Sequence, residues 1–349
     1  MKVGTQDILF PTMMVGSYPR PDWLRGKVFG EFGEPDYIDY NSKERFFDAT
    51  QLCVDDQVRA GLDVVADGQQ YFEAETMHEY GQVFHFWGHH LGGYERWGDP
   101  ITIDLYKKFH APLVTGEVEW VRPIYAGAAE ALLVAAGLHG RPTKIAVQGP
   151  LFLAFASTDH HYGDLPTLAM AIARAFNKEF KDLAARGIDM IQIHEPLTYY
   201  GEEPWYLDVV NTAFAGVDAH RIWHICYGNQ GGNPGVADQR GQDMFPFAFE
   251  ADVDQIHIET MRRGPGDLEY LEDLPSHMSL GVGVIDVKTT VVEHPQDVAS
   301  RLLEAADIVG AERVCASGDC GLLNLKREHA FLKLKATAEG AALARTEIG

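Results

Sequence analysis

The stretch Arg221-Ile-Trp-His-Ile-Cys-Tyr-Gly-Asn229 has the composition of a buried β-strand that ends at a glycine. Side chains alternate between the two faces of a strand, so His224 and Cys226 point to the same side. An imidazole and a thiol held side by side on a rigid element are ligands that suit zinc. Two later strand ends, Ile256-His-Ile-Glu259 and Ser317-Gly-Asp-Cys320, each finish on one more side chain of a metal-binding type. The sequence therefore predicts a metal site built from the ends of three strands.

Short apolar segments alternate with amphipathic helices along the 349-residue chain. Eight segments have the length and the apolar content of buried strands, and most of them stop at a polar residue or a turn residue. They span residues 13–17, 63–68, 144–149, 190–195, 221–229, 256–259, 278–285 and 314–317. Because no Gly-x-Gly-x-x-Gly turn occurs, this alternation favours an α/β fold of the (β/α)8 TIM barrel type over a dinucleotide-binding sheet.

The barrel prediction also fixes the domain organisation. We predict one (β/α)8 catalytic domain over residues 1–349, with a long insertion after the second strand, at residues 70–142, that flanks the barrel mouth. Long helices are expected over residues 42–61 and 324–346. Another helix follows the third strand, with an apolar face that includes Leu168, Ile172, Phe176 and Phe180. Polar side chains that follow the strands lie at the C-terminal mouth, where barrel enzymes keep their chemistry.

The charge of the chain excludes several classes of partner. With 29 basic and 51 acidic residues the net charge is −22, which repels phosphate backbones and anionic lipid, so we expect no nucleic acid and no membrane as partner. No apolar run approaches the ~20 residues of a membrane span, and the N-terminus has no signal-peptide pattern. Four cysteines in a chain of this length do not indicate a disulfide-bonded framework, and we expect Cys53 and Cys315 to pack in the core. The expected location is cytoplasmic.

Seven motifs in the same order resemble the C-terminal catalytic barrel of cobalamin-independent methionine synthase. They are Val15-Gly-Ser-Tyr-Pro19, Asp67-Gly-Gln69, Ile191-Gln-Ile-His-Glu-Pro196, His224-Ile-Cys-Tyr227, Ile258-Glu-Thr260, Gly283-Val-Ile-Asp286 and Asp319-Cys-Gly-Leu322. Full-length synthases carry a second, N-terminal barrel that has no counterpart in this sequence. The chain therefore resembles the short, single-barrel relatives, which include epoxyalkane:coenzyme M transferases.

The resemblance implies a zinc site. In that family a His-x-Cys pair, a Glu and a later Cys hold the metal, and these fall on His224, Cys226, Glu259 and Cys320. The alternative is a satisfied buried histidine with inert buried thiols. A free thiol is mostly protonated at neutral pH, and coordination to zinc removes its proton. The implied activity is that of a zinc-dependent alkyltransferase, in first place a methyltransferase, that acts on a zinc-bound substrate thiolate.

Two positions depart from the family pattern where the substrate thiol binds. Ser17 matches a family residue that helps to hold the carboxylate of homocysteine, although a serine beside prolines also suits a plain turn, and Arg20 adds positive charge. Gln69 and His194 stand where the synthases have carboxylates that pair with the ammonium group of homocysteine. A buried ammonium without a counter-charge costs several kcal/mol. The departures favour a thiol with an anionic or uncharged tail, such as the sulfonate of coenzyme M.

Three other carboxylates are candidates for supplying negative charge to this pocket. Glu195 stands beside His194 and joins the candidate substrate-binding residues, but strand alternation points the two side chains to opposite faces. Glu73 or Glu75, in the insertion, is an alternative source of the missing negative charge.

The candidate catalytic residues are His194, Asp286 and Lys288. Lys288 replaces a histidine that, in full-length synthases, is thought to handle the proton of the leaving group. It can protonate a leaving alkoxide, bind an anion, or pair with Asp286.

Several functions stay open at this point. The partners are a small-molecule thiol and an alkyl donor, with a corrinoid protein or a folate as candidate methyl carriers, and folate is disfavoured because the acidic chain has no basic patch for a polyglutamate tail. The second candidate reaction is the opening of an epoxide by a zinc-bound thiolate. Zinc hydrolysis ranks lower, since two thiolates make the metal a poorer Lewis acid. A structural zinc in a binding protein is disfavoured because the ligands lie on separate strands.

Overall fold

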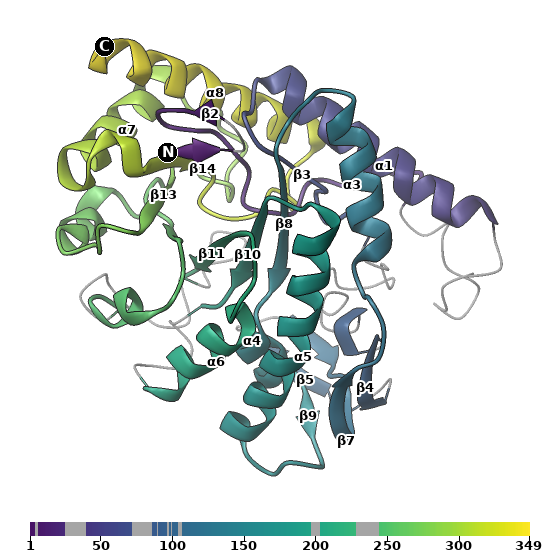
Figure 1. Cartoon of the computed structure of the whole chain (residues 1–349). Coiled ribbons are helices and arrows are strands. Elements are labelled where there is room, and N and C mark those ends of the chain that lie inside the picture. The colour runs from purple at the N-terminus through teal and green to yellow at the C-terminus, as the bar shows by residue number, and fades with distance from the viewer. Residues whose placement is uncertain are drawn as a thin grey trace.

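The computed structural model describes residues 1–3, 6–24, 40–71, 86–88, 90–95, 98, 100–103, 107–196, 203–227 and 244–349. At its centre is a parallel sheet of seven strands in the order β14-β13-β12-β11-β10-β8-β3 (Figure 1). The strands are β3 (Val65–Ala66), β8 (Thr143–Gln148), β10 (Met190–His194), β11 (His220–Ile225), β12 (Gln255–Ile258), β13 (Ser279–Gly283) and β14 (Val314–Ser317). Their order follows the chain, as in a barrel whose neighbours are joined by helical crossovers.

The segment that precedes β3 in the barrel closes the sheet between its two edge strands. On one side the Met13 N–H donates to Ala316 O at 3.0 Å, and the Ala316 N–H donates to Pro11 O at 2.9 Å. On the other side the Val64 N–H donates to Thr12 O at 3.0 Å. These bonds fill the eighth position and confirm the predicted (β/α)8 barrel. The predicted strand over residues 13–17 is nevertheless not formed as a strand, and the single bridge here, from Thr12 to Ala316, lies just before it.

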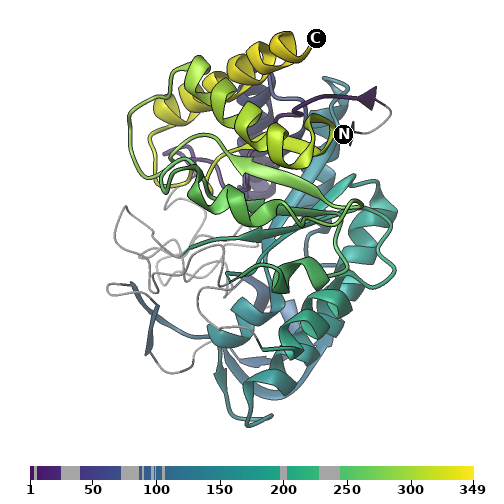
Figure 2. The same ribbon diagram turned by 90° about the vertical axis from the view of Figure 1, so that its left-hand side faces the viewer.

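Helices form the outer layer. They are α1 (Tyr40–Ala60), α3 (Ala126–Gly137), α4 (Pro150–Phe155), α5 (Leu165–Arg186), α6 (Trp205–Phe214), α7 (Pro295–Val309) and α8 (Arg327–Ile348). The described parts of the crossovers after β11 and β12 contain short 3-10 helices, η4 (Phe247–Glu250) and η5 (Pro265–Leu271), and η6 (Ala311–Arg313) precedes β14. Figure 2 shows α7 and α8 packed side by side over one edge of the sheet, where they contact β13 and β14. None of the described helices combines the length and the apolar character that a membrane crossing demands.

Sequence chemistry explains where α5 begins and ends. The Asp164 carboxylate accepts the Thr167 N–H at 2.9 Å as the N-cap, and Gly187, with φ of 99°, ends the helix in the left-handed region that favours glycine. All four side chains predicted for its apolar face are buried, which confirms that prediction.

The two faces of the strands have different chemistry. Outward-facing Trp223 and Ile225 join the large core between sheet and helices. Inward-facing Met190, Ile222 and Cys315 pack in the barrel interior with Met13 and Val64. Further along the same strands the inward positions become polar, and the candidate site is built there.

The segment between β3 and β8 contains further strands outside the central sheet, and the short strand β9 (Thr158–Asp159), which follows β8, joins them. β4 (Leu91–Glu95) pairs antiparallel with β7 (Leu113–Trp120), β5 (Pro100–Ile103) pairs antiparallel with β6 (Lys107–His110), and β9 runs parallel to β7. Figure 1 shows β4, β7 and β9 grouped on one side of the barrel, next to α5.

Buried Glu179 of α5 ties this segment to the barrel. Its carboxylate accepts the Trp120 Nε1–H at 2.6 Å and the N–H groups of Ile124 and Tyr125 at 2.8 and 2.7 Å. The single-domain organisation and the flanking of the mouth by residues 70–142 stay predictions.

The two ends of the chain meet on one side of the molecule (Figures 1 and 2). There β1 (Lys2–Val3) and β2 (Gln6–Asp7) form a small antiparallel pair. Arg345, near the end of α8, donates to Leu9 O at 2.7 Å and to Phe10 O at 3.0 Å.

Candidate functional site

The four predicted metal ligands lie close together where their strands end. Two groups of three ligand atoms, each within 4.8 Å of one another, share Cys320: one adds His194 and His224, and the other adds Cys226 and Glu259. The Sγ atoms of Cys226 and Cys320 are 4.0 Å apart. Two thiolates that bind one tetrahedral zinc at about 2.3 Å stand roughly 3.8 Å apart. The arrangement therefore fits a divalent metal ion of zinc's geometry.

Three histidines lie side by side on neighbouring strands of the barrel interior. His194 of β10 is the register partner of His224 of β11, which is the register partner of His257 of β12. The ring centroids are 4.7 Å apart in both pairs. Burial, with His194 and His257 adding to it, holds the pKa of His224 well below its usual value, so the imidazole is neutral, the form that binds metal.

One ring nitrogen of His224 is available for a metal ion. Its Nδ1 lies 2.5 Å from Nδ1 of His257, while its Nε2 is buried and has no hydrogen-bond partner among the described residues. A buried polar nitrogen without a partner is costly, and coordination of a metal ion would satisfy it. His257 was not singled out from the sequence.

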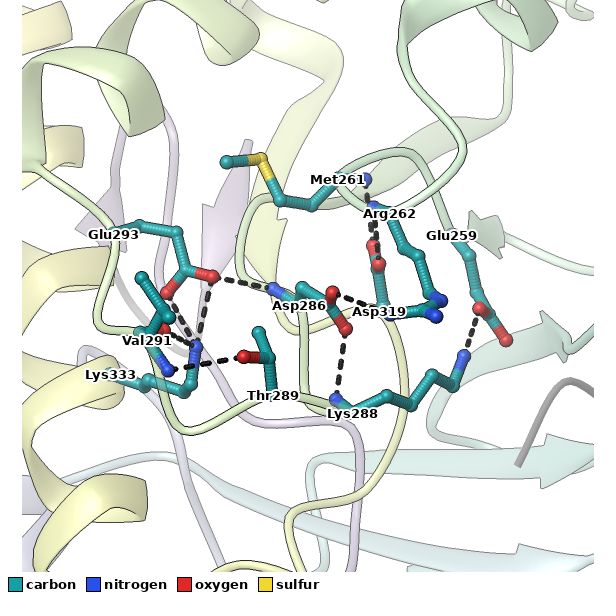
Figure 3. Close-up of polar contacts among 10 residues, drawn as sticks. All are labelled: Glu259, Met261, Arg262, Asp286, Lys288, Thr289, Val291, Glu293, Asp319 and Lys333. Atoms are coloured by element: carbon teal, nitrogen blue, oxygen red, sulfur yellow. Dashed lines mark hydrogen bonds and ion pairs between the residues drawn. The ribbon is translucent and has the colours of Figure 1, made fainter. Parts of the chain in front are cut away.

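Lys288 forms an ion pair with Glu259 (Figure 3). Both side chains are buried, and a second carboxylate oxygen, Glu259 Oε1, accepts the Tyr227 N–H at 3.3 Å. Burial alone would lower the pKa of Lys288, but Glu259, Cys226 and Cys320 together raise it, so the ammonium form is stable next to the two thiols.

Asp286 has different partners from those considered in the sequence. Its carboxylate pairs with Arg262 at 3.1 Å and accepts the backbone N–H of Lys288 at 2.9 Å. Figure 3 shows the Lys288 side chain extending away from Asp286 toward Glu259. The ammonium of Lys288 thus belongs to the candidate metal-binding cluster, whereas Asp286 lies in an adjoining ion pair.

Asp319 joins the two loops that carry Glu259 and Cys320. Its buried carboxylate accepts three backbone N–H groups, from Thr260 at 3.0 Å, Met261 at 2.9 Å and Arg262 at 2.8 Å. Figure 3 shows the contacts with Met261 and Arg262. Burial, with the nearby charge of Glu259, raises the pKa of Asp319 to about 7. The sequence placed Asp319 in a motif, but the partners of its carboxylate depend on how the loops meet.

Ser17 lies at the seam where the barrel closes, next to the loop that carries Cys320. Its carbonyl accepts the Leu322 N–H at 2.8 Å. A Cβ atom at Gly321 would come within 2.1 Å of Ser17 Oγ, so only glycine permits this approach. The structure therefore brings Ser17 beside the candidate metal-binding cluster.

Arg20 and Gln69 contact each other at the same edge of the barrel. Arg20 is buried and donates to Gln69 O at 3.2 Å. Gln69 has a positive φ of 55° and its Nε2 donates to Ala146 O at 2.9 Å. Glu73 and Glu75, the alternative source of negative charge, lie outside the described residues.

Glu195 and His194 point to opposite sides of their strand end. The oxygens of Glu195 accept the N–H groups of Leu151 at 2.6 Å and Phe152 at 2.9 Å, at the start of α4. Burial raises the pKa of Glu195 to about 8. Since both oxygens bind backbone, Glu195 anchors α4, whereas His194 faces the cluster and stacks on Phe152 with ring centroids 5.9 Å apart.

Comparison with known proteins identifies the family. A family model described as cobalamin-independent synthase, catalytic domain, matches residues 10–343. A 2-hydroxypropyl-CoM lyase of Xanthobacter autotrophicus is 33% identical over 377 residues, covering 100% of this chain and 98% of that protein. A methionine synthase of Saccharolobus solfataricus is 29% identical, covering 97% and 96%. The solved structure of a B12-independent methionine synthase from Shewanella, in complex with selenomethionine, superposes with a TM-score of 0.84 at 27% identity, covering 98% of this chain and 99% of that one. These matches confirm the resemblance found in the seven motifs: the chain belongs to the cobalamin-independent methionine synthase family and corresponds to its catalytic barrel.

Proposed function

We propose that this chain is a zinc-dependent transferase that moves an alkyl group to or from a thiolate, with His224, Cys226, Glu259 and Cys320 as zinc ligands. One observation carries the proposal: two thiols stand 4.0 Å apart beside a buried carboxylate, in a cluster that a neutral histidine with a free Nε2 completes. Histidine nitrogen, cysteine sulfur and carboxylate oxygen are all donor types found in catalytic zinc sites. When bound, zinc supplies the charge that converts a substrate thiol into a nucleophilic thiolate.

The ion pair of Lys288 with Glu259 balances the charge of this site. Two cysteine thiolates and one carboxylate bring three negative charges, and the ammonium of Lys288 offsets one of them next to the metal. A further anion, the substrate thiolate, then enters a site that is less negative than the ligands alone would make it. Lys288 thus favours the binding of a deprotonated thiol.

The thiol that fits best has an anionic or uncharged tail. The side chains at the two positions where the synthases carry carboxylates are Gln69 and His194, and the buried guanidinium of Arg20 lies against Gln69. This environment opposes an ammonium group and suits a sulfonate or a carboxylate. Homocysteine is therefore a poor candidate, and a short mercapto acid or mercapto sulfonate is a good one.

A second candidate reaction is the opening of an epoxide by the thiolate. The relative named 2-hydroxypropyl-CoM lyase, at 33% identity over the whole chain, favours it. In this reaction a C–S bond forms while a C–O bond of the epoxide breaks, and the resulting alkoxide must take up a proton. His194, which faces the cluster, and Lys288 are the candidate donors.

The test is a matrix of thiols and alkyl donors on the zinc-loaded protein. The thiols are homocysteine, coenzyme M and 3-mercaptopropionate, and the donors are a methylfolate, a methylcorrinoid and epoxypropane. We expect turnover with coenzyme M or the mercapto acid and little with homocysteine. Zinc-edge X-ray absorption should report a new Zn–S contact with the same thiols. A protein that binds no zinc, or that gains a Zn–S contact with none of these thiols, would contradict the proposal.

A further inference from the structure

His257 lies directly beside the predicted zinc ligand His224, inside the barrel. The two residues are register partners on β11 and β12, so their side chains project from the same face of the sheet. Both are buried, and their Nδ1 atoms are 2.5 Å apart. The two ring nitrogens are therefore within hydrogen-bonding reach of each other.

Such a contact requires that one nitrogen donates and the other accepts. If His257 donated, His224 would carry its own proton on Nε2 and could not bind a metal through that atom. If His224 donates from Nδ1, its Nε2 has a free lone pair. That Nε2 is buried and has no hydrogen-bond partner in the described part of the chain, and the same holds for His257 Nε2, which carries the proton of its ring in this state. Metal binding therefore selects the state in which His257 is the acceptor.

The neighbouring strand leaves room for the second ring. Gly281 of β13 is the register partner of His257. A Cβ atom at position 281 would lie 2.4 Å from Cδ2 and 3.0 Å from Cβ of His257. Any side chain at position 281 would displace the His257 ring, so the glycine preserves the contact with His224.

We infer that His257 is a positioning residue for zinc: its Nδ1 accepts the Nδ1–H of His224 and so fixes the ligand's tautomer and ring orientation. The inference rests on the proposed zinc function. Glu259 follows β12 directly, two residues after His257, so this strand and its end bring one proposed ligand and the partner of another to the same site. Partners of this kind typically change metal affinity by about 10- to 100-fold.

The test compares two substitutions of His257 in the full chain. His257→Leu keeps most of the volume and removes the acceptor, and we expect zinc affinity to fall about 10- to 100-fold. His257→Asn places an amide oxygen near the position of Nδ1, and we expect it to restore the affinity to within about threefold of the parent protein, following the same hydrogen-bond logic. Affinity is measured by competition with a chromophoric chelator, and the His224 tautomer by long-range ¹H–¹⁵N NMR correlation.

Controls separate this inference from the zinc proposal and from misfolding. Metal-free variants are compared by circular dichroism and thermal unfolding, and Cys320→Ser gives the reference for loss of a direct ligand. If the parent protein binds no zinc, the proposed function fails. If the parent protein binds zinc and His257→Leu binds it equally well, or if His257→Asn is as weak as His257→Leu, the positioning role is wrong.

Discussion

The ammonium of Lys288 lies against the carboxylate of Glu259 in the barrel mouth, and both groups are buried beside the thiols of Cys226 and Cys320. A cation in this place gives a negatively charged ligand set a counter-charge that does not depend on solvent. Removal of the Lys288 ammonium should therefore weaken anion binding more than it destabilises the fold.

Replacement of Lys288 by Met should weaken thiol binding to the zinc-loaded protein on the order of tenfold or more, because a buried charged hydrogen bond is lost. Isothermal titration with the preferred thiol, at several pH values, measures the effect. Lys335→Met, at an exposed lysine of α8, is the control and should bind as the parent protein does. Equal affinities in all three proteins would show that the ion pair has no role in binding.

Replacement of Cys320 by Ser should remove the zinc. Cys320 belongs to both ligand groups, so its loss breaks each of them. Metal analysis of the purified protein should fall from about one zinc per chain to a small fraction of that value. Cys315→Ala is the matched control, since this buried thiol lies in the barrel interior and in neither ligand group, and it should keep the metal. Full zinc content in Cys320→Ser would make the ligand assignment wrong.

The double substitution Gln69→Glu with His194→Asp should improve the affinity for homocysteine by about tenfold, because two carboxylates can pair with its ammonium group. The affinity for coenzyme M should fall in the same protein, since its sulfonate would meet like charge. Competition between the two thiols, followed by zinc-edge absorption, tests both directions at once. No gain for homocysteine would mean that these two positions do not select the thiol.

Asp319→Asn should loosen the loops that hold the ligands. The amide cannot accept all three N–H groups that the carboxylate accepts, which should cost about 2 to 3 kcal/mol of unfolding free energy. Urea unfolding of the metal-free protein measures this cost, and zinc affinity should fall in parallel. Asp307→Asn, at an exposed position of α7, is the control. Unchanged stability would remove Asp319 from the framework of the site.

Stability should also depend on the ionisation of Asp67. Burial raises the pKa of this carboxyl from 3.8 to about 7, against the opposing effects of nearby backbone N–H groups and Arg20. A raised folded-state pKa stabilises the fold fully below the unfolded value, and that contribution is lost as pH rises toward 7. Relative to Asp67→Asn, the parent protein should therefore lose on the order of 4 kcal/mol between pH 4 and pH 7.5. Chemical unfolding of both metal-free proteins across this range measures the difference between their unfolding free energies. A difference that does not change with pH would contradict the prediction.

Hydrophobic patterning was sufficient to predict most of the barrel. β8, β10 and β14 begin and end within one residue of their predicted bounds, because strands buried on both faces are continuous apolar runs with polar ends. The predicted strand over residues 63–68 shrinks to Val65–Ala66, and the one over 13–17 is replaced by a single bridge at Thr12. Both lie at the seam of the barrel, where hydrogen bonding depends on how the sheet closes rather than on local composition.

The sequence predicted which residues form the candidate site, but not which of them contact one another. Alternation along one strand put His224 and Cys226 on one face, and the structure brings Glu259 and Cys320 to them. The pairing of His224 with His257 depends on the register of two strands, which no single sequence pattern contains. The ion pair of Lys288 likewise depends on the relative position of two loops.

The hydrogen bonds at Ala316, which join the last strand of the barrel to the segment before β3, have a consequence for how the protein matures. Cys320, a proposed zinc ligand, follows that same last strand, so on the proposed ligand set a growing chain should not hold the metal ion tightly before its ring of strands is complete. We therefore expect tight zinc binding only after the barrel has folded, so that zinc retention can serve as a measure of folding. A ribosome-bound fragment that stops before β14 would release zinc to a weak chelator that the finished protein resists.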